Sequence, residues 1–253
     1  MKKFALLLAA GFMSSVAMAE VTKDEIINTY FENTGGLEAW GKVESIRMTG
    51  EFNQGSMKFP VTLVQMKDGR SYMEFEFQGK KLKQGVFDGE TVWSTNFMTM
   101  KAEKADSEQT ENTKLNINDF PDALYNYKEK GYSLEMLGEE TIDGVETYKL
   151  KLTKEPVTIE GKKVDDVTYY YFDKDSMIPL VQETEIKSGP AKGQISQVKA
   201  SDFQEVEGLY FPFSIAQGIK GGQSAPIEIK TIELNVDVDP SEFSMPKADE
   251  KNK

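Results

Sequence analysis

The sequence of 253 residues contains no cysteine and no histidine. Without cysteine it can form no disulfide and offer no thiol nucleophile, and without either residue it cannot build a zinc site of the usual nitrogen and sulfur ligands. Without histidine there is no imidazole to serve as a general base near neutral pH. Any catalysis would have to use carboxylates, lysine, tyrosine or serine.

Basic residues are scarce relative to acidic ones, with 30 Lys and Arg against 42 Asp and Glu and a formal net charge of −12. A surface of this sign repels phosphate-rich partners, which argues against nucleic acid as a partner and opposes loose adsorption to an anionic membrane. Mutual repulsion also keeps such a chain soluble, so we expect a monomer.

One long apolar run occurs, and it stands at the N-terminus. Lys2 and Lys3 precede the apolar segment 4–16, and Ala17-Met18-Ala19 follows it. This is the pattern of a cleaved secretory signal peptide over residues 1–19, and the run is too short to span a bilayer. No cysteine follows the cleavage site, so we expect no lipid anchor. Export without disulfides favours the bacterial periplasm as the location.

The segment after the leader predicts a helix. Thr22 and Glu25 have the spacing of a capping box, and the apolar side chains Ile26, Ile27, Tyr30 and Phe31 then recur on one side until Gly35 and Gly36. A short second turn carries Leu37 and Trp40.

From residue 43 onward the apolar period falls to two, which indicates strands. Turn pairs such as Asp68-Gly69 and Asp88-Gly89 separate the runs and predict an antiparallel meander from about residue 43 to 97. Strands resume between residues 133 and 236. The predicted fold class is mainly β with a few helices, an α+β arrangement of about eleven strands. We expect one domain over residues 20–246 and a charged, flexible tail over 247–253.

Between the two groups of strands, the alternation is interrupted. The polar, acidic segment 98–116 predicts a long surface loop. A helix is expected after it, with Asp119 as its cap, Pro121 in its first turn and Gly131 at its end. The apolar residues on one side of that helix include Phe120, Leu124 and Tyr127.

Motifs that could carry chemistry are weak. Ser196 and Lys199 have the spacing of a serine–lysine nucleophile pair, but on a strand they would point to opposite faces. The segment that starts at Asp173 lacks the glycine and glutamate of a calcium loop. Paired acids such as Glu183 and Glu185 suit the solvent side of a sheet. We therefore expect no catalytic residues, no metal and no cofactor, with a histidine-free hydrolase as a remote alternative.

The apolar residues of the strands form the strongest functional signal. About a dozen strands must curl or close, and so few helices would leave part of the concave face uncovered as an apolar cavity. Methionine and aromatic side chains adapt well to irregular apolar ligands. The candidate cavity residues are Ile46, Met48, Phe52, Phe59, Val61, Leu63, Met73, Phe75, Phe77, Trp93, Tyr148, Leu150, Tyr169, Tyr171, Phe211 and Phe213. Phe120, Leu124 and Tyr127 are the candidate lid. The alternative is a core filled by these same side chains, which would suit an envelope scaffold or interaction module.

Six segments also carry a family resemblance. They are the helix and turn from Tyr30 to Trp40, Ile46 to Gly50, Tyr169 to Asp173, Ile178 to Leu180, Gly208 to Pro212, and Val238 to Pro246. Over essentially the whole chain after the leader, the order of these segments resembles the periplasmic outer-membrane lipoprotein-sorting proteins, the LolA/LolB-like superfamily. The resemblance lies in architecture and diffuse pattern, without a short diagnostic motif.

The resemblance implies an incomplete, strongly curved antiparallel β-barrel whose concave apolar face is covered by helices. It also implies a periplasmic carrier that binds the acyl chains of lipoproteins, or other lipids, for transport to the outer membrane. Inner- and outer-membrane lipoprotein-transport components would then be candidate partners. Carriers of this family tether the lid with an arginine, and Arg47 is the candidate for that role.

Overall fold

The computed structural model describes residues 21–54 and 57–246. The predicted signal peptide, residues 1–19, and the predicted tail, residues 247–253, lie outside the described residues.

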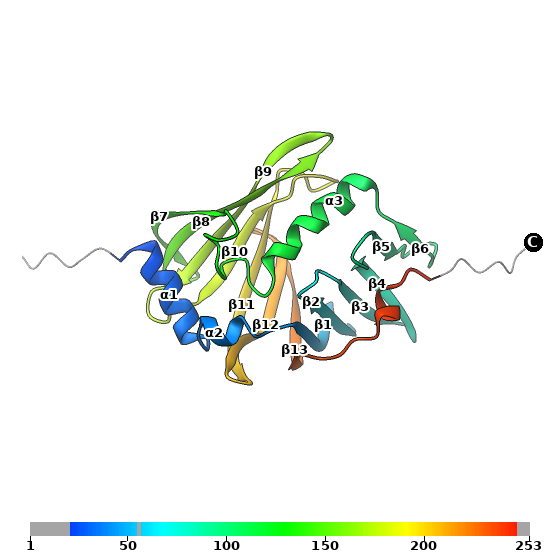
Figure 1. Ribbon diagram of the computed structural model, residues 1–253, viewed down its shortest axis with the longest axis horizontal. Coiled ribbons are helices and arrows are strands. Elements are labelled where there is room, and N and C mark those ends of the chain that lie inside the picture. Colours follow the sequence, from blue (N-terminus) through cyan, green and yellow to red (C-terminus); the bar gives the residue numbers. More distant parts are fainter. Residues whose placement is uncertain (1–20, 55–56, 247–253) are drawn as a thin grey trace, which may run out of the picture.

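Thirteen strands form a single antiparallel sheet in the order β6-β5-β4-β3-β2-β1-β13-β12-β11-β10-β9-β8-β7 (Figure 1). The strands are β1 (Ser45–Gln54), β2 (Met57–Met66), β3 (Ser71–Phe77), β4 (Lys80–Phe87), β5 (Val92–Thr95), β6 (Ala102–Lys104), β7 (Ser133–Ile142), β8 (Val145–Ile159), β9 (Lys162–Asp173), β10 (Pro179–Glu185), β11 (Ile195–Val206), β12 (Leu209–Ile219) and β13 (Ser224–Leu234). The first and last strands pair in the middle of the sheet, so two meanders are joined there.

The sheet is curved, but its edge strands β6 and β7 are not neighbours in it, so the barrel is incomplete. The predicted fold class is therefore confirmed. The strand count exceeds the expected eleven in part because β6 lies inside the segment expected to be a loop.

Helices α1 (Lys23–Asn33) and α2 (Leu37–Trp40) lie against the concave face of the sheet (Figure 1). The predicted capping box is present: the Glu25 amide donates to Thr22 Oγ1 at 3.2 Å, and the Thr22 amide donates to Glu25 Oε2 at 2.7 Å. The buried apolar side of α1 packs with Trp40 and with residues of β8 and β12 in the main core. The start of the chain is thus fixed on the sheet by the residues that predicted the helix.

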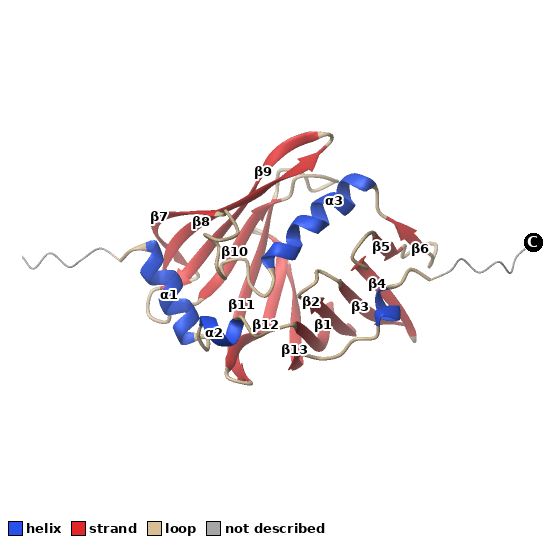
Figure 2. Cartoon of the chain, viewed as in Figure 1, coloured by secondary structure: helices blue, strands red, loops and turns tan. Residues whose placement is uncertain are grey.

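The expectation of a loop over residues 98–116 is wrong, because the segment contains β6 and the helix α3 (Ser107–Leu115). Figure 2 shows α3 lying in front of the sheet. Its sequence, SEQTENTKL, is polar on every side, so no apolar period announces it. Asp106 caps α3 by accepting from the Gln109 amide at 2.7 Å. The Asn112 side chain exchanges two hydrogen bonds with the backbone of Thr158 on β8, at 2.7 and 2.8 Å.

The predicted helix over 119–131 is also wrong. A 3-10 turn, η1 (Asn116–Asp119), is followed by successive turns up to residue 131. The Asp122 side chain accepts from the Leu124 amide at 2.7 Å, and this local bond competes with a helical one. Leu124 and Tyr127 are nevertheless buried, because compact turns can also place residues three apart on the same side.

A second, smaller apolar cluster lies on the convex face. It contains Val64, Tyr72, Val86, Trp93, Val238 and Phe243. The segment after β13, including the 3-10 turn η2 (Pro240–Phe243), supplies two of these residues. The Trp93 indole donates to the carbonyl oxygen of Phe243 at 2.9 Å, so the C-terminal segment is fixed across the back of β2–β5.

Candidate functional site

The concave face carries a continuous apolar strip across five neighbouring strands. In register, Ile215 of β12 pairs with Ile227 of β13, Ile227 with Phe52 of β1, and Phe52 with Phe59 of β2. A second row joins Met48, Leu63 and Met73 of β1, β2 and β3. Paired residues of an antiparallel sheet share a face, so these side chains project to the same side. The apolar strip is defined here as Met48, Phe52, Phe59, Leu63, Met73, Phe75, Phe213 and Ile215.

The two helices bury only part of the concave face. Ile46, Leu150 and Phe211 are buried in the core beneath α1 and α2, and the Trp40 ring lies 5.1 Å from that of Phe211. Every residue of the apolar strip, by contrast, keeps partial exposure to solvent. The ring centroids of Phe52 and Phe75 are 6.0 Å apart, so the strip is packed within itself while its surface stays accessible.

A hollow of about 500 Å³ adjoins the strip between β4–β6 and the start of α3. Gln84, Ser94 and Gln109 line it together with the apolar Phe97 and Met98. Gln84 pairs with Met73 of the strip, so the hollow opens beside the apolar surface. The apolar strip is the candidate site, and the hollow is a neighbouring feature at the β4–β6 end.

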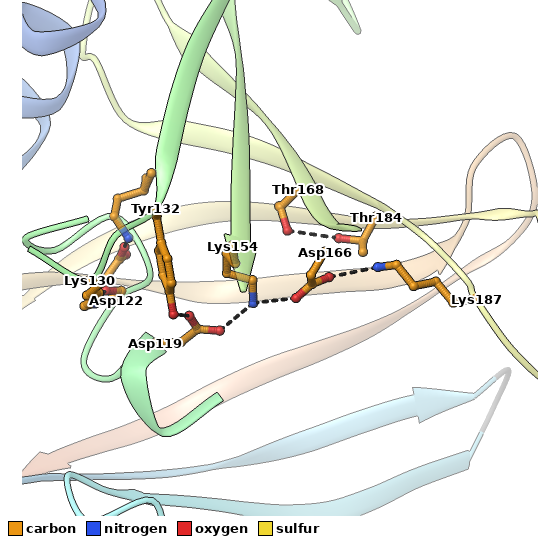
Figure 3. Close-up of polar contacts among 10 residues, drawn as sticks. Asp119, Asp122, Lys130, Tyr132, Lys154, Asp166, Thr168, Thr184 and Lys187 are labelled. Carbon is orange, nitrogen blue, oxygen red and sulfur yellow. Dashed lines mark hydrogen bonds and ion pairs between the residues drawn. The ribbon is translucent and has the colours of Figure 1, made fainter. Parts of the chain in front are cut away.

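A row of alternating charges extends from β8 on the same concave face (Figure 3). Lys154 Nζ lies 2.6 Å from Asp119 Oδ2 and 3.1 Å from Asp166 Oδ2. Lys187 Nζ lies 2.8 Å from Asp166 Oδ1, and the Tyr132 hydroxyl donates to Asp119 Oδ1 at 3.0 Å. These four charged side chains are the ionic row.

The surroundings of Asp166 and Lys154 favour the charged form of each. Burial by itself would raise the pKa of Asp166, but hydrogen bonds and charges from Lys187 and Lys154 outweigh it, and the pKa is lowered. Burial would lower the pKa of Lys154, yet Asp119 and Asp166 raise it. Two cations and two anions compensate one another, so the row forms a polar wall rather than a proton donor.

The candidate lid residues come from the turns before β7, and they pack against α1 and the main core. Leu124 and Tyr127 are buried there, and Phe120 packs against the same core. The Tyr127 hydroxyl donates to Asp24 Oδ1 at 2.9 Å, and Lys128 Nζ lies 2.9 Å from Asp24 Oδ2. A cleft of about 240 Å³ separates α1 from residues 124–129. A movement of this segment as a lid stays a prediction.

Most of the candidate cavity residues share the concave face: Ile46, Met48, Phe52, Phe59, Val61, Leu63, Met73, Phe75, Phe77, Tyr148, Leu150, Phe211 and Phe213. Tyr169, Tyr171 and Trp93 do not, and their assignment to the cavity is wrong. Tyr171 donates to Glu183 Oε2 at 2.9 Å on the convex face, and Trp93 belongs to the convex cluster.

The neighbours of the misassigned tyrosines occupy the concave face instead. Tyr170 pairs with Leu150, and Phe172 pairs with Tyr148. The run Thr168–Phe172 contains four consecutive aromatics, so polarity does not mark which side of it faces inward, and a shift of one residue exchanges the faces. The ionic row was also missed, because its members come from separate segments and share no spacing.

The assignment of Arg47 as a lid tether is wrong as well. Its guanidinium Nη1 lies 3.8 Å from Glu233 Oε2, and its strand neighbours Ile46 and Met48 face the concave side. Arg47 therefore forms an ion pair on the convex face, away from Leu124 and Tyr127.

Groups of three or more acidic side chains placed to hold a metal ion do not occur within residues 21–54 and 57–246. In the same ranges, no helix has the length and apolar character needed to cross a bilayer.

The sequence and the fold were compared with those of known proteins. No protein-family model matches the sequence, and no curated protein matches it significantly. Among solved structures, a domain from Vibrio parahaemolyticus described as an outer membrane lipoprotein-sorting protein is 14% identical and superposes with a TM-score of 0.51, covering 87% of this chain and 94% of that one. The chain has the LolA-like fold.

A second similar structure carries that family name. A LolA superfamily protein from Nitrosomonas europaea is also 14% identical with a TM-score of 0.51, over 89% of this chain and 98% of its own. The LolA-like fold thus accounts for nearly the whole of both chains. At this identity the similarity shows the fold alone, and the functional residues of this chain rest on its own geometry.

Proposed function

We propose that this protein is a non-enzymatic periplasmic carrier that holds an acyl chain of a lipoprotein, or of another lipid, on the apolar strip. The observation that carries the proposal is the partial exposure of the strip. A core meant only for stability would bury Phe52, Phe75 and Phe213, because exposed apolar area forgoes the free energy of burial. A ligand would cover what the helices leave open.

The energetics suit a soluble carrier. Each acyl CH₂ moved from water to an apolar surface gains about 0.8 kcal/mol, so a chain of about sixteen carbons gains on the order of 12 kcal/mol before the costs of ordering it. The hollow lies beside the strip, whereas the ionic row is centred on Lys154 of β8 and Asp166 of β9, with β10 and β11 between it and the strip. An acyl chain released from the strip would pass to a second lipid-binding partner.

The LolA-like fold and the predicted signal peptide support this function. The names of the two similar structures refer to lipoprotein sorting and to the LolA superfamily. Inner- and outer-membrane components of lipoprotein transport are therefore the partners we propose for loading and unloading.

A scaffold or interaction module is the second candidate, and one observation favours it. Under α1 and α2 the concave face is filled by the chain itself, with Phe31, Trp40 and Phe211 buried together. If side chains of the protein covered the apolar strip in the same way in solution, no acyl chain could bind there.

The test is native mass spectrometry of protein purified from the periplasm without detergent, followed by extraction and identification of lipid. Uptake of a fluorescent fatty acid is then measured for the wild type and for the double variant Phe52→Asp/Phe75→Asp. Leu137→Asp, at an exposed apolar position on β7, is the matched control. We expect the double variant alone to lose uptake while its circular dichroism remains that of the wild type. A wild type that carries no lipid and takes up no probe would contradict the carrier.

A further inference from the structure

The exposed methionine and phenylalanine side chains gather at one end of the sheet. Within residues 21–54 and 57–246, every exposed Phe or Met lies there. They are Met57, Phe77, Phe97, Met98 and Met100, with exposed fractions that reach 60% at Phe97 and 91% at Met98. Large apolar side chains that are exposed together mark an interaction surface more often than a solvent face.

The register explains why these residues meet. β1 and β2 join near Met57, which pairs with Gln54, and β3 and β4 join where Phe77 pairs with Lys80. β5 and β6 join beyond the pair of Thr95 with Ala102. In a meander, alternate turns lie at the same end of the sheet. These three hairpin tips therefore form one edge, called here the apolar rim.

The opposite end of the same strands differs in composition. The turn between β2 and β3 reads Lys67-Asp68-Gly69-Arg70, and the turn between β4 and β5 reads Asp88-Gly89-Glu90-Thr91. Neither contains a large apolar residue. The apolar character is thus specific to one end of the half-sheet and is no general property of its turns.

The outermost tip holds its apolar side chains in a fixed turn. The Asn96 side chain accepts from the Met98 and Thr99 amides at 2.9 and 3.1 Å, and the Asn96 amide donates to the Lys101 carbonyl at 2.8 Å. Phe97 and Met98 are therefore presented outward by a hydrogen-bonded loop, without burying either side chain in the protein.

Charge separates the rim from the rest of the chain. Its three tips carry the lysines Lys58, Lys80, Lys81, Lys101 and Lys104 and the glutamates Glu51, Glu76 and Glu103. Lysine is in excess here, whereas the whole chain has a net charge of −12. The rim is thus a part of the surface that an anionic partner does not repel.

The geometry points to a lipid bilayer as the surface that the apolar rim contacts. Phe97 and Met98 would enter the zone between headgroups and acyl chains, while the lysine stems extend their amines toward the lipid phosphates. A bilayer suits three separate tips because it needs no shape complementarity, whereas a protein interface needs a contiguous packed centre.

The rim also continues into the apolar strip. The ring of Phe77, at the rim, lies 5.8 Å from that of Phe59, and the ring of Phe59 lies 6.4 Å from that of Phe52. An apolar path thus runs from the docked end to the concave face. Docking itself does not rest on the proposed function, because the rim can bind lipid surfaces whether or not the strip holds an acyl chain.

The test is flotation of the full mature protein with vesicles of phosphatidylethanolamine and phosphatidylglycerol. The variant is Phe97→Ser/Met98→Ser, and the control is Leu137→Ser, which removes an exposed apolar residue from the far edge strand β7. We expect the double variant to lower the partition coefficient by roughly tenfold or more, and the control to leave it unchanged. In Phe97→Trp, vesicles should shift the emission of the new indole to shorter wavelength.

Three results would overturn the bilayer assignment. They are a wild type that does not float, a double variant that floats as well as the wild type, and a wild-type dimer that the double variant dissociates, which would make a second copy the occupant. Fatty-acid uptake from albumin keeps the two proposals apart. Phe52→Asp/Phe75→Asp should lose uptake and still float, and the rim variant should take up probe and fail to float.

Discussion

The hydroxyl of Tyr30 donates a 2.9 Å hydrogen bond to the buried carboxylate of Asp122, which stands 92 residues later in the chain. The bond joins α1 to the turns that carry the candidate lid residues. Lys130 Nζ donates to the Asp122 carbonyl oxygen at 2.9 Å, so the same residue is held through its backbone as well. This connection, and not Arg47, fixes the segment on the helix.

Removing the Tyr30 hydroxyl should therefore destabilise the fold. In Tyr30→Phe a hydrogen bond is lost and a buried carboxylate oxygen loses its partner, which together cost about 1–3 kcal/mol. Urea unfolding followed by circular dichroism measures the change. Tyr125→Phe is the control, because its ring also packs on α1, with its centroid 5.9 Å from that of Phe31. Equal stability of Tyr30→Phe and the wild type would show that the bond contributes nothing.

Asp122 should make stability depend on pH in an unusual direction. Burial raises the pKa of its carboxyl above the ordinary value of 3.8, although hydrogen bonds from Leu124 and Tyr30 oppose the shift. The folded state then holds the proton more tightly than the unfolded state, so this contribution is full below the unfolded pKa and is lost as pH rises through the folded pKa. Asp122→Asn has no carboxyl to titrate, so it should not lose this stability as pH rises.

The measurement is the difference in unfolding free energy between wild type and Asp122→Asn across a series of pH values. The unfolding free energy of the variant should rise relative to that of the wild type as pH increases from acid to neutral. A difference that is constant with pH would mean that the carboxyl titrates alike in both states.

The ion pairs of Lys154 should give a pH dependence of stability opposite to that of Asp122. Lys154 neutralises both Asp119 and Asp166, and Lys154→Met would leave the two carboxylates partly buried without it. Breaking a buried pair costs 3–5 kcal/mol, and we expect roughly 1–3 kcal/mol here because solvent still reaches the row. In the wild type the lowered pKa of Asp166 gives stability that is present at neutral pH and is lost as pH falls through that pKa.

Thermal unfolding at neutral pH and in acid tests this. The Lys154→Met variant should lose stability mostly at neutral pH, and the gap to the wild type should narrow in acid. Lys151→Met is a matched control, since its partner Glu135 is more exposed. If both variants lose the same small amount, the ionic row contributes no more than a surface pair.

Local patterns predicted the parts of the fold that local forces decide. The capping box of Thr22 and Glu25 located α1, and Asp-Gly turns with period-two alternation located the meander. The same alternation predicted every residue of the apolar strip except Ile215. Each of these signals lies within a few residues of the element it describes.

The errors arise where partners distant in sequence decide the structure. The polar helix α3 is held by the backbone of β8 around Thr158, and the ionic row joins residues as far apart as Asp119 and Lys187. The inward side of Tyr169–Phe172 likewise depends on pairing with β8. No spacing within one segment reports such contacts. Arg47 is a different case, because alternation with Ile46 and Met48 already predicts the opposite face and only the family resemblance suggested a tether.

Gly35 offers a test of how α1 and α2 are seated on the sheet. Its φ is +115°, and a Cβ there would overlap the carbonyl oxygen of Gly208 in the turn between β11 and β12. The Tyr210 amide donates to the Thr34 carbonyl at 3.1 Å beside it, so the helix end and this turn are in direct contact. Gly35→Ala should thus combine backbone strain with a clash and destabilise the protein by roughly 2–4 kcal/mol.

Gly79 supplies the comparison, because its φ is also positive, at +71°, but a Cβ there meets no other atom. Gly79→Ala should cost only the backbone term, about 1 kcal/mol. Urea unfolding gives both values, and hydrogen exchange of the α1 amides reports whether the helix detaches. Similar losses in the two variants would mean that the close approach of Gly35 to Gly208 does not hold the helices on the sheet.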